Sequence, residues 1–228
     1  ALDPTLFVID GDFHYANIGD PDADAFRDVL DLNLSQPGPS MLYRSIPIAY
    51  VWDDHDYGGN NGDSTSPTRA TALSVYRQYV PSYLSAGPAT DADDPIFQAF
   101  DIGDVRMVLT DVRSARTPAD RPDDADKTML GVEQKAWLKA ELLAARDTHA
   151  LTVWVNPVPW IGEATPGGDG WNGYGTERAE LADFIAANGI ERLLMLSGDA
   201  HMVAIDDGTN SGYASEGSPG FPSLHAGA

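Results

Sequence analysis

The sequence predicts an α/β domain in which buried strands alternate with amphipathic helices. Three observations lead to this class: short apolar runs of strand length recur, segments with apolar residues at helical spacing lie between them, and no internal repeat interrupts the order. The 228 residues, 43% of them hydrophobic, are enough for one substantial domain with its own core. We therefore expect residues 1–228 to form a single domain.

The first third of the chain contains two predicted strands, each followed by a helix. An apolar run at 5–10 ends in Gly-Asp and predicts a buried strand with a tight turn after it. Apolar residues then recur at helical spacing from 26 to 34. A second apolar run at 46–52 leads directly into an acidic segment. A loop rich in Gly, Asn, Ser and Thr at 58–68 precedes a helix around 72–79.

The middle of the chain continues this alternation. Two apolar runs at 96–102 and 105–111 are separated by Gly-Asp and predict a strand pair. The polar, Pro- and Asp-rich segment 114–128 predicts a surface loop. A helix at 132–146 and a strand at 150–155 follow.

The last third begins with a long loop. Residues 156–175 are rich in Gly, Pro and Trp, and long ordered loops in compact domains are often functional. A helix at 176–188, closed by Gly189, and a strand at 192–196 complete the pattern. This strand leads into Ser-Gly-Asp-Ala-His, another polar segment at a strand end.

The composition is strongly acidic, with 14 Lys and Arg against 35 Asp and Glu and a formal net charge of -21. Such a surface repels nucleic-acid backbones and anionic membranes, so we expect no nucleic-acid partner. No run of about 18 apolar residues occurs, so we expect no stable membrane insertion. The acidity fits either simple solubility or a salty medium. An anionic substrate would also be repelled by this surface, and bound metal cations would be needed to attract it.

The chain contains no Cys, which excludes disulfides, zinc thiolates and a Cys nucleophile. Any metal site must therefore use oxygen and nitrogen ligands, which hard or borderline ions prefer. The lack of Cys carries no information about the cellular compartment.

Three of the predicted strands end in side chains that can bind metal. In open α/β sheets, sites form beyond the carboxyl ends of the strands. We therefore expect the three strand ends to lie in one sheet and their polar side chains to form one site: Asp10 and Asp12, Asp53 and Asp54, and Asp199 and His201.

The first of these strand ends combines a turn with two oxygen ligands. Gly11 lets the backbone turn sharply after the strand. The two oxygens of Asp12 can bridge two cations, and Tyr15 can reach the same ion as a phenolate. The alternative is a capping Asp and a packed Tyr without a metal.

The second strand end places three carboxylates around one imidazole. Asp53, Asp54 and Asp56 flank His55 and repel one another, so their pKa values would rise without a cation. Asn60 follows within reach, and amide oxygens suit hard ions. The alternative is a solvated acidic loop.

Further candidates lie later in the chain. Asp199 and His201 point to the same side of an extended segment and can face one ion pair. Arg113 can clamp a phosphoryl oxygen with two hydrogen bonds, or it can pair with Asp111. Asn172 lies in the long loop and can form a wall of the pocket, although a surface loop fixed by aromatic residues explains it equally well.

At this point the motifs resemble those of the alkaline phosphatase D (PhoD-like) family of metallophosphoesterases. The matching segments occur in family order from 11 to 201: Gly11-Asp12-x-x-Tyr15, Trp52-Asp53-Asp54-His55-Asp56-Tyr57-Gly58-x-Asn60, Thr110-Asp111-Val112-Arg113, Leu130-Gly131-x-Glu133-Gln134-x-x-Trp137-Leu138, Asn156-x-Val158-Pro159-Trp160, Trp171-Asn172-Gly173-Tyr174 and Leu196-Ser197-Gly198-Asp199-x-His201. The resemblance implies a fold of two packed sheets flanked by helices and a centre that holds Fe³⁺ and Ca²⁺. Zn²⁺ or Mn²⁺ is used elsewhere in the superfamily.

The resemblance also implies a role for each side chain. Asp12 would bridge the metals and His55 would lie near the phosphoryl group as a donor. The ferric ion would take Tyr15 and His201, and the calcium ion would take Asp53, Asn60 and Asp199. Asp54 remains an alternative to Asp53. Arg113 and Asn172 complete the candidate catalytic residues.

Three departures from the family pattern accompany the resemblance. The family has a strand upstream of Gly11-Asp12 that supplies a further ligand, a Cys in iron-bound members, and more strands after Ser218-Pro219-Gly220. We expect this chain to lack such terminal strands. The usual Trp-Asp-Gly-Tyr is Trp171-Asn172-Gly173-Tyr174 here.

The resulting functional hypothesis is hydrolysis of small phosphate esters by a metal-bound hydroxide at a two-metal centre. A phosphodiesterase or phospholipase D-type activity on the same scaffold is one alternative. A calcium-binding module and a catalytically inactive calcium-binding relic are two others. The resemblance implies a secreted or periplasmic location, although the chain begins without a signal peptide, and the oligomeric state stays open.

Overall fold

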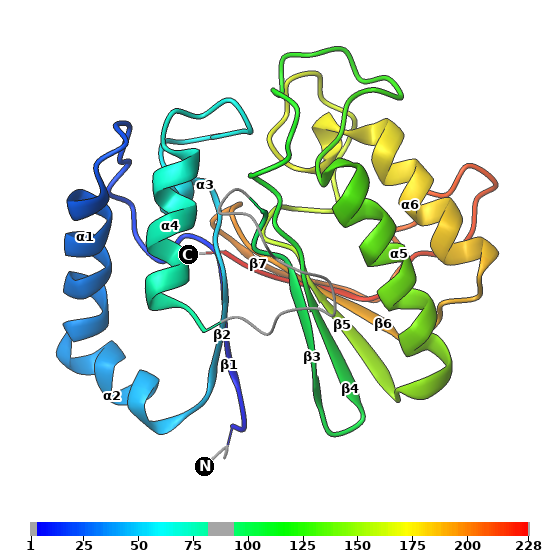
Figure 1. The fold of residues 1–228 in the computed structure, drawn as a ribbon. Coiled ribbons are helices and arrows are strands. Elements are labelled where there is room, and N and C mark those ends of the chain that lie inside the picture. The colour runs from blue at the N-terminus through cyan, green and yellow to red at the C-terminus, as the bar shows by residue number, and fades with distance from the viewer. Residues whose placement is uncertain (1–3, 82–93, 228) are drawn as a thin grey trace.

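The computed structural model describes residues 4–81 and 94–227, whose strands form two sheets (Figure 1). The smaller sheet pairs β1 (Phe7–Asp10) in parallel with β2 (Ile48–Val51). The larger sheet has the strand order β3-β4-β5-β6-β8-β7. Its strands are β3 (Gln98–Ile102), β4 (Val105–Leu109), β5 (Leu151–Val155), β6 (Leu193–Ser197), β7 (Val203–Asp206) and β8 (Ser223–Ala226).

Strand directions place the carboxyl ends of several strands at one edge of the larger sheet. The four inner strands β4, β5, β6 and β8 run parallel to one another, whereas the edge strands β3 and β7 are antiparallel to the strands they pair with. Because β1 and β2 are also parallel to each other, their polar ends lie together. The loops after β1, β2 and β6 then converge.

Helices cover the outer faces of both sheets, as Figure 1 shows. On the side of the smaller sheet lie α1 (Ala23–Ser35), α2 (Pro37–Ser45) and α4 (Arg69–Tyr79), with the single turn α3 (Asp54–Tyr57) between β2 and α4. On the far side of the larger sheet lie α5 (Gly131–Thr148) and α6 (Gly175–Ala187), joined to the loop that carries the short helix η1 (Trp171–Gly173).

The central strands β4 and β5 of the larger sheet are largely buried on both faces, and their side chains alternate between two cores. Val108 and Trp154 belong to the core beneath α5 and α6, which also contains Leu142. Their strand neighbours Leu109 and Val155 belong to the core shared with the smaller sheet, α1 and α4. This alternation follows from the period of two along a strand. It explains why the strands appear in the sequence as continuous apolar runs.

The predicted fold class, an α/β protein with two sheets flanked by helices, is therefore confirmed. The prediction that the three acidic strand ends belong to one sheet is wrong, because β1 and β2 form the smaller sheet and β6 belongs to the larger one. β1 is also only partly buried, with Phe7 37% exposed. The site is thus assembled across two sheets.

The segment 114–128 was predicted to be a surface loop, and this is wrong for three of its side chains, of which Ser114 is the first. Arg116 is fully buried and Lys127 is 3% exposed. The Lys127 ammonium group donates to the carbonyl of Gly173, and Arg116 donates to the Tyr174 hydroxyl. The segment is anchored to the long loop by buried cations, which a polar composition does not reveal.

The sequence patterns also missed five short elements. α2 begins with Pro37, a single residue separates it from the end of α1, and its Pro-Gly-Pro start has the composition of a loop. η1 has three residues and α3, β7 and β8 have four each, too few for periodicity to identify. β8 also lies after Ser218-Pro219-Gly220, where we expected no further strand. Within 4–81 and 94–227, every helix is too short or too polar to cross a bilayer.

Candidate metal centre

Two glycines bring the three acidic strand ends together. Gly11 has a φ of +84°, and a Cβ there would lie 2.5 Å from the Cβ of Asp53. A Cβ at Gly198 would lie 2.7 Å from the carbonyl oxygen of Asp10. Only glycine allows backbones this close, so these two positions fix the approach of β1 to both β2 and β6.

Two aspartates beside these glycines adopt a left-handed backbone conformation. Asp12 has a φ of 52° and Asp199 a φ of 70°. Such a conformation costs an L residue about 1 kcal/mol or more, and structures retain it chiefly at functional sites. It turns both carboxylates toward the meeting point of the strands.

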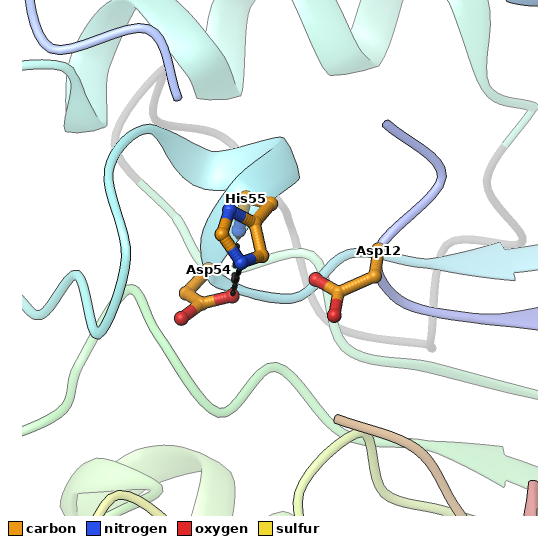
Figure 2. A group of neighbouring side chains, drawn as sticks. All are labelled: Asp12, Asp54 and His55. Carbon is orange, nitrogen blue, oxygen red and sulfur yellow. Dashed lines mark hydrogen bonds and ion pairs between the residues drawn. The ribbon is translucent and has the colours of Figure 1, made fainter. Parts of the chain in front are cut away.

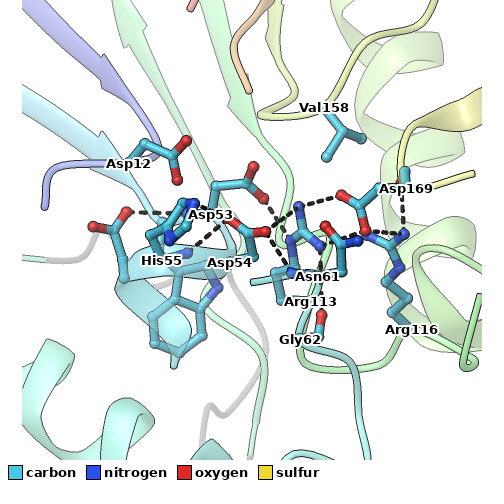
Figure 3. Close-up of polar contacts among 12 residues, drawn as sticks. Asp12, Asp53, Asp54, His55, Asn61, Gly62, Arg113, Arg116, Val158 and Asp169 are labelled. Atoms are coloured by element: carbon cyan, nitrogen blue, oxygen red, sulfur yellow. Dashed lines mark hydrogen bonds and ion pairs between the residues drawn. The ribbon is translucent and has the colours of Figure 1, made fainter. Parts of the chain in front are cut away.

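The converging carboxylates form two overlapping groups with the spacing of metal ligands. Asp12, Asp54 and His55 offer one ligand atom each, and these atoms lie within 4.8 Å of one another (Figure 2). Asp12, Asp53, Asp54 and Asp199 form the second group at the same spacing (Figure 3 includes the first three). Asp12 and Asp54 belong to both groups, so two neighbouring cations would share them.

The cluster is shielded from water and short of positive charge. Asp53 is fully buried and Asp54 is 1% exposed. One oxygen of Asp12, one of Asp53 and both of Asp10 are buried without a hydrogen-bond partner among the described residues. Burial, with smaller contributions from neighbouring carboxylates, raises the pKa of Asp12 and of Asp10. Carboxylates in such surroundings need a cation to stay ionised together.

Burial also raises the pKa values of Asp199 and Asp53, and in both cases Arg113 opposes the rise. Burial raises the pKa of Asp199 to about 6, although the charge of Arg113 opposes this. Burial also raises the pKa of Asp53, and Arg113 is again the main opposing influence. One arginine therefore does not neutralise the cluster.

The two buried aspartates of the turn α3 have different partners. Asp54 accepts hydrogen bonds from the backbone N–H groups of His55 (2.7 Å) and Asn61 (2.6 Å). Asp56 accepts from the backbone of Asp53 (3.1 Å), which closes the start of the turn. Burial raises the pKa of Asp56 to about 7. Asp54 faces the cluster, and Asp56 stabilises the backbone that carries it.

Tyr15 and His201 lie at the exposed rim of the cluster. The Tyr15 hydroxyl donates to Asp12 at 3.0 Å and lies 3.2 Å from Nε2 of His201. Tyr15 is 43% exposed, and burial followed by the charge of Asp12 raises its pKa. These two side chains thus extend the cluster outward from Asp12.

His55 lies beside the cluster in a defined orientation. Its Nδ1 lies 2.6 Å from the amide oxygen of Asn17, and the amide nitrogen of Asn17 donates to the carbonyl of Tyr15. The Tyr15 ring lies 4.4 Å from the imidazole, centroid to centroid. The Nε2 atom lies 3.9 Å from Asp54.

Arg113 is fully buried, and its guanidinium group binds protein carboxylates. Its Nε donates to Asp53 at 2.5 Å, and its two Nη groups donate to Asp169 at 3.0 and 2.7 Å (Figure 3). Asp111, the alternative partner expected from the sequence, instead accepts from backbone N–H groups and from the Trp52 indole. The guanidinium group thus joins the acidic cluster to the long loop.

Two other candidate residues make no hydrogen bond to the converging carboxylates within the described part of the chain. Asn60 is exposed, and the neighbouring Asn61 makes the contact with Asp54. The side chain of Asn172 lies against the backbones of Gly168 and Gly170. The long loop reaches the cluster through Asp169, between those two glycines. The sequence analysis missed Asp169 and Arg116, because an Asp among glycines and an Arg in a polar loop carry no periodic signal.

The two-sheet fold and the carboxylate centre define the class of this protein. The chain belongs to the PhoD-like phosphatase family, whose model matches residues 16–221. Among curated relatives it is similar to alkaline phosphatase D of Bacillus subtilis (strain 168), with 25% identity over 185 residues. That match covers 70% of this chain and 32% of the relative, so the chain spans about a third of the relative's length.

Solved structures carry the same fold. The structure of PhoD has a TM-score of 0.81 at 20% identity, covering 98% of this chain and 51% of that one. A dimetal phosphatase from Danio rerio has a TM-score of 0.57 at 15% identity, covering 97% of this chain and 71% of that one. The resemblance drawn from the motifs is thereby confirmed at the level of family and fold.

Proposed function

We propose that this chain hydrolyses phosphate esters at a centre of two metal cations held by Asp12, Asp53, Asp54 and Asp199. One observation carries the proposal: two buried and two half-buried carboxylates offer ligand atoms within 4.8 Å of one another, and two of the four have a buried oxygen with no partner in the described structure. A group this acidic and this far removed from water fits multivalent cations.

The donor set favours hard or borderline cations. It consists of carboxylates with a phenol and two imidazoles nearby, and the chain has no thiol. Fe³⁺ and Ca²⁺ are our proposed pair, with Zn²⁺ or Mn²⁺ as the alternatives. Asp12 would be shared between them, with Tyr15 and His201 on the side of the ferric ion and Asp53, Asn60 and Asp199 on the side of calcium.

Two such cations, when bound, lower the pKa of a water molecule and offset the negative charge of the phosphoryl oxygens. The chain's own residues then orient the reaction. Asp12 and Asp54, which belong to both ligand groups, would help to hold both cations. His55, fixed by Asn17 at the edge of the cluster, donates a proton to the departing alcohol. Burial of the carboxylates excludes bulk water.

Arg113 and Asn172 enter the proposal through the loop rather than through direct contact with substrate. The fully buried guanidinium group of Arg113 donates to Asp53 and to Asp169, so its proposed task is to hold Asp53. Asn172 packs on the glycines around Asp169 and shapes the loop beside the centre. A small phosphate ester, attracted by the cations across an acidic surface, is the proposed substrate. A location outside the cytoplasm is proposed from the family resemblance alone.

Elemental analysis beside an assay on chromogenic phosphate esters tests this function. We expect about two metal equivalents per chain and hydrolysis that a chelator abolishes and the metals restore. Rates on p-nitrophenyl phosphate and bis-p-nitrophenyl phosphate then distinguish a monoesterase from a diesterase. A metal-loaded protein without hydrolysis, whose melting temperature calcium raises, would instead be a calcium-binding module or an inactive relic.

A further inference from the structure

We propose that Asp169 is a positioning residue of the metal centre, which acts through Arg113 to decide which oxygen of Asp53 faces the cations. The inference rests on the proposed function, because it concerns ligands of the same centre. It assigns a task to a residue of the long loop that touches none of the proposed ligands itself.

Asp169 is the carboxylate that fixes the guanidinium plane of Arg113. Its two oxygens accept from the two Nη groups of Arg113 at 3.0 and 2.7 Å, a geometry that holds a planar cation in one orientation. Arg116 donates to the same carboxylate at 2.8 Å and to the Asp169 carbonyl at 2.5 Å. Asp169 is therefore held from two sides, and its side chain is only 15% exposed.

The fixed guanidinium divides the two oxygens of Asp53 between different partners. Nε of Arg113 donates to Oδ1 of Asp53 at 2.5 Å. Oδ2 of Asp53 is buried and has no hydrogen-bond partner among the described residues. Asp53 also contributes a ligand atom to the group with Asp12, Asp54 and Asp199. One oxygen thus belongs to the arginine, and the other is left for a cation.

Without the Asp169 carboxylate, Arg113 would compete with the metal. Its Nη2 already lies 4.0 Å from Oδ2 of Asp54, which is a proposed ligand. A guanidinium freed from Asp169 would gain that second carboxylate and bring an uncompensated positive charge to the cluster. Both the lost orientation of Asp53 and the added charge weaken cation binding. Residues that orient metal ligands typically change metal affinity about 10–100-fold.

Titration of metal-depleted protein with Mn²⁺, followed by calorimetry, tests the inference. We expect Asp169→Asn to bind Mn²⁺ about 10–100-fold more weakly than the wild type, although its amide keeps the size of the side chain. Asp120→Asn removes the same charge from an exposed position and controls for net charge. It should leave the dissociation constant within about twofold.

A second control separates positioning from loosening of the loop. Arg178 donates to the carbonyls of Trp160 and Gly162 in the same loop. Arg178→Met should lower the melting temperature and leave the Mn²⁺ dissociation constant unchanged. If Asp169→Asn does not fold, Asp169→Glu keeps the charge with a longer side chain and should still weaken Mn²⁺ binding severalfold.

Two results would overturn the inference in different ways. A folded Asp169→Asn or Asp169→Glu protein with the wild-type dissociation constant would refute the role of Asp169 and leave the metal centre intact. Wild-type protein that binds neither Mn²⁺ nor Ca²⁺ would refute the centre itself, and the inference with it.

Discussion

Asp169 and Asp199 are both shielded aspartates near Arg113, yet their acidities move in opposite directions. Burial alone would raise the pKa of Asp169, but the charges of Arg113 and Arg116 outweigh it and hold the pKa to about 2. For Asp199, Arg113 does not offset burial, and the pKa rises to about 6. The two pKa values differ because of the number and geometry of the arginine side chains beside each aspartate, and not because of burial.

This contrast separates two regions of the molecule. Around Asp169, two arginines balance the buried carboxylate, and the network is complete without a ligand. Around Asp12 and Asp199, carboxylates outnumber the single arginine, and buried oxygens have no partner among the described residues. The first region has the charge balance of a structural network, whereas the second has an excess of negative charge that the proposed metal cations would offset.

Asp12→Asn should cause the largest change in metal content and activity, and it tests the difference between the two regions directly. Asn tolerates the left-handed backbone at this position and removes only the charge. We expect loss of bound metal and a fall in hydrolysis of at least about 10³-fold, because cations supply several kcal/mol of transition-state stabilisation. The metal-free variant should be at least as stable as the metal-free wild type. Retention of both metal and activity would refute the assignment of Asp12.

Arg113→Leu should produce the largest loss of stability, because Arg113 forms ion pairs with aspartates of both regions. The substitution leaves Asp53 and Asp169 buried with one cation fewer. Breaking a buried ion pair from one side costs about 3–5 kcal/mol. Urea denaturation measures the change, and added divalent metal should recover part of it. A loss below about 1 kcal/mol would mean that the two regions are balanced independently of Arg113.

The acidic cluster should make the metal-free protein less stable as the pH rises. Asp199, with a pKa of about 6, and Asp56, with a pKa of about 7, keep protons in the folded state that the unfolded chain releases near pH 4. Stability therefore falls between about pH 4 and pH 7, by up to about 3 kcal/mol from Asp199 and about 4 kcal/mol from Asp56. Melting temperatures across this range test the sign. Saturating metal should remove the contribution of Asp199, which faces the cluster, and leave most of that of Asp56, and a flat profile without metal would contradict the raised pKa values.

Asp169 should show the opposite and smaller dependence on pH. Its pKa of about 2 lies below the unfolded value near 4, so its stabilising contribution is complete above pH 4 and is lost as the pH falls toward 2. The stability difference between wild type and Asp169→Asn should therefore shrink by about 1 kcal/mol from pH 6 to pH 3. A difference that does not change with pH would show that the arginines do not depress this pKa.

The features that the sequence predicted and those that it missed also fall into these two regions. Short apolar runs form the strands that precede Asp12, Asp53 and Asp199. The positions of these runs in the chain predicted both the α/β class and the candidate ligands. These features are local, because an apolar run and the polar residue behind it are adjacent in sequence. The residues that orient the centre are different. Asp169 and Arg113 are 56 positions apart, and no periodicity connects them.

The sequence by itself determined the alternation of strands and helices, the acidic strand ends and the family motifs. It did so because backbone periodicity and turn chemistry act over a few residues. The tertiary structure alone decided that β1 and β2 form a separate sheet and that Arg113 binds Asp53 and Asp169. It also decided which carboxylates have cations beside them. Burial and charge balance depend on contacts between distant segments, and these exist only after the chain has folded.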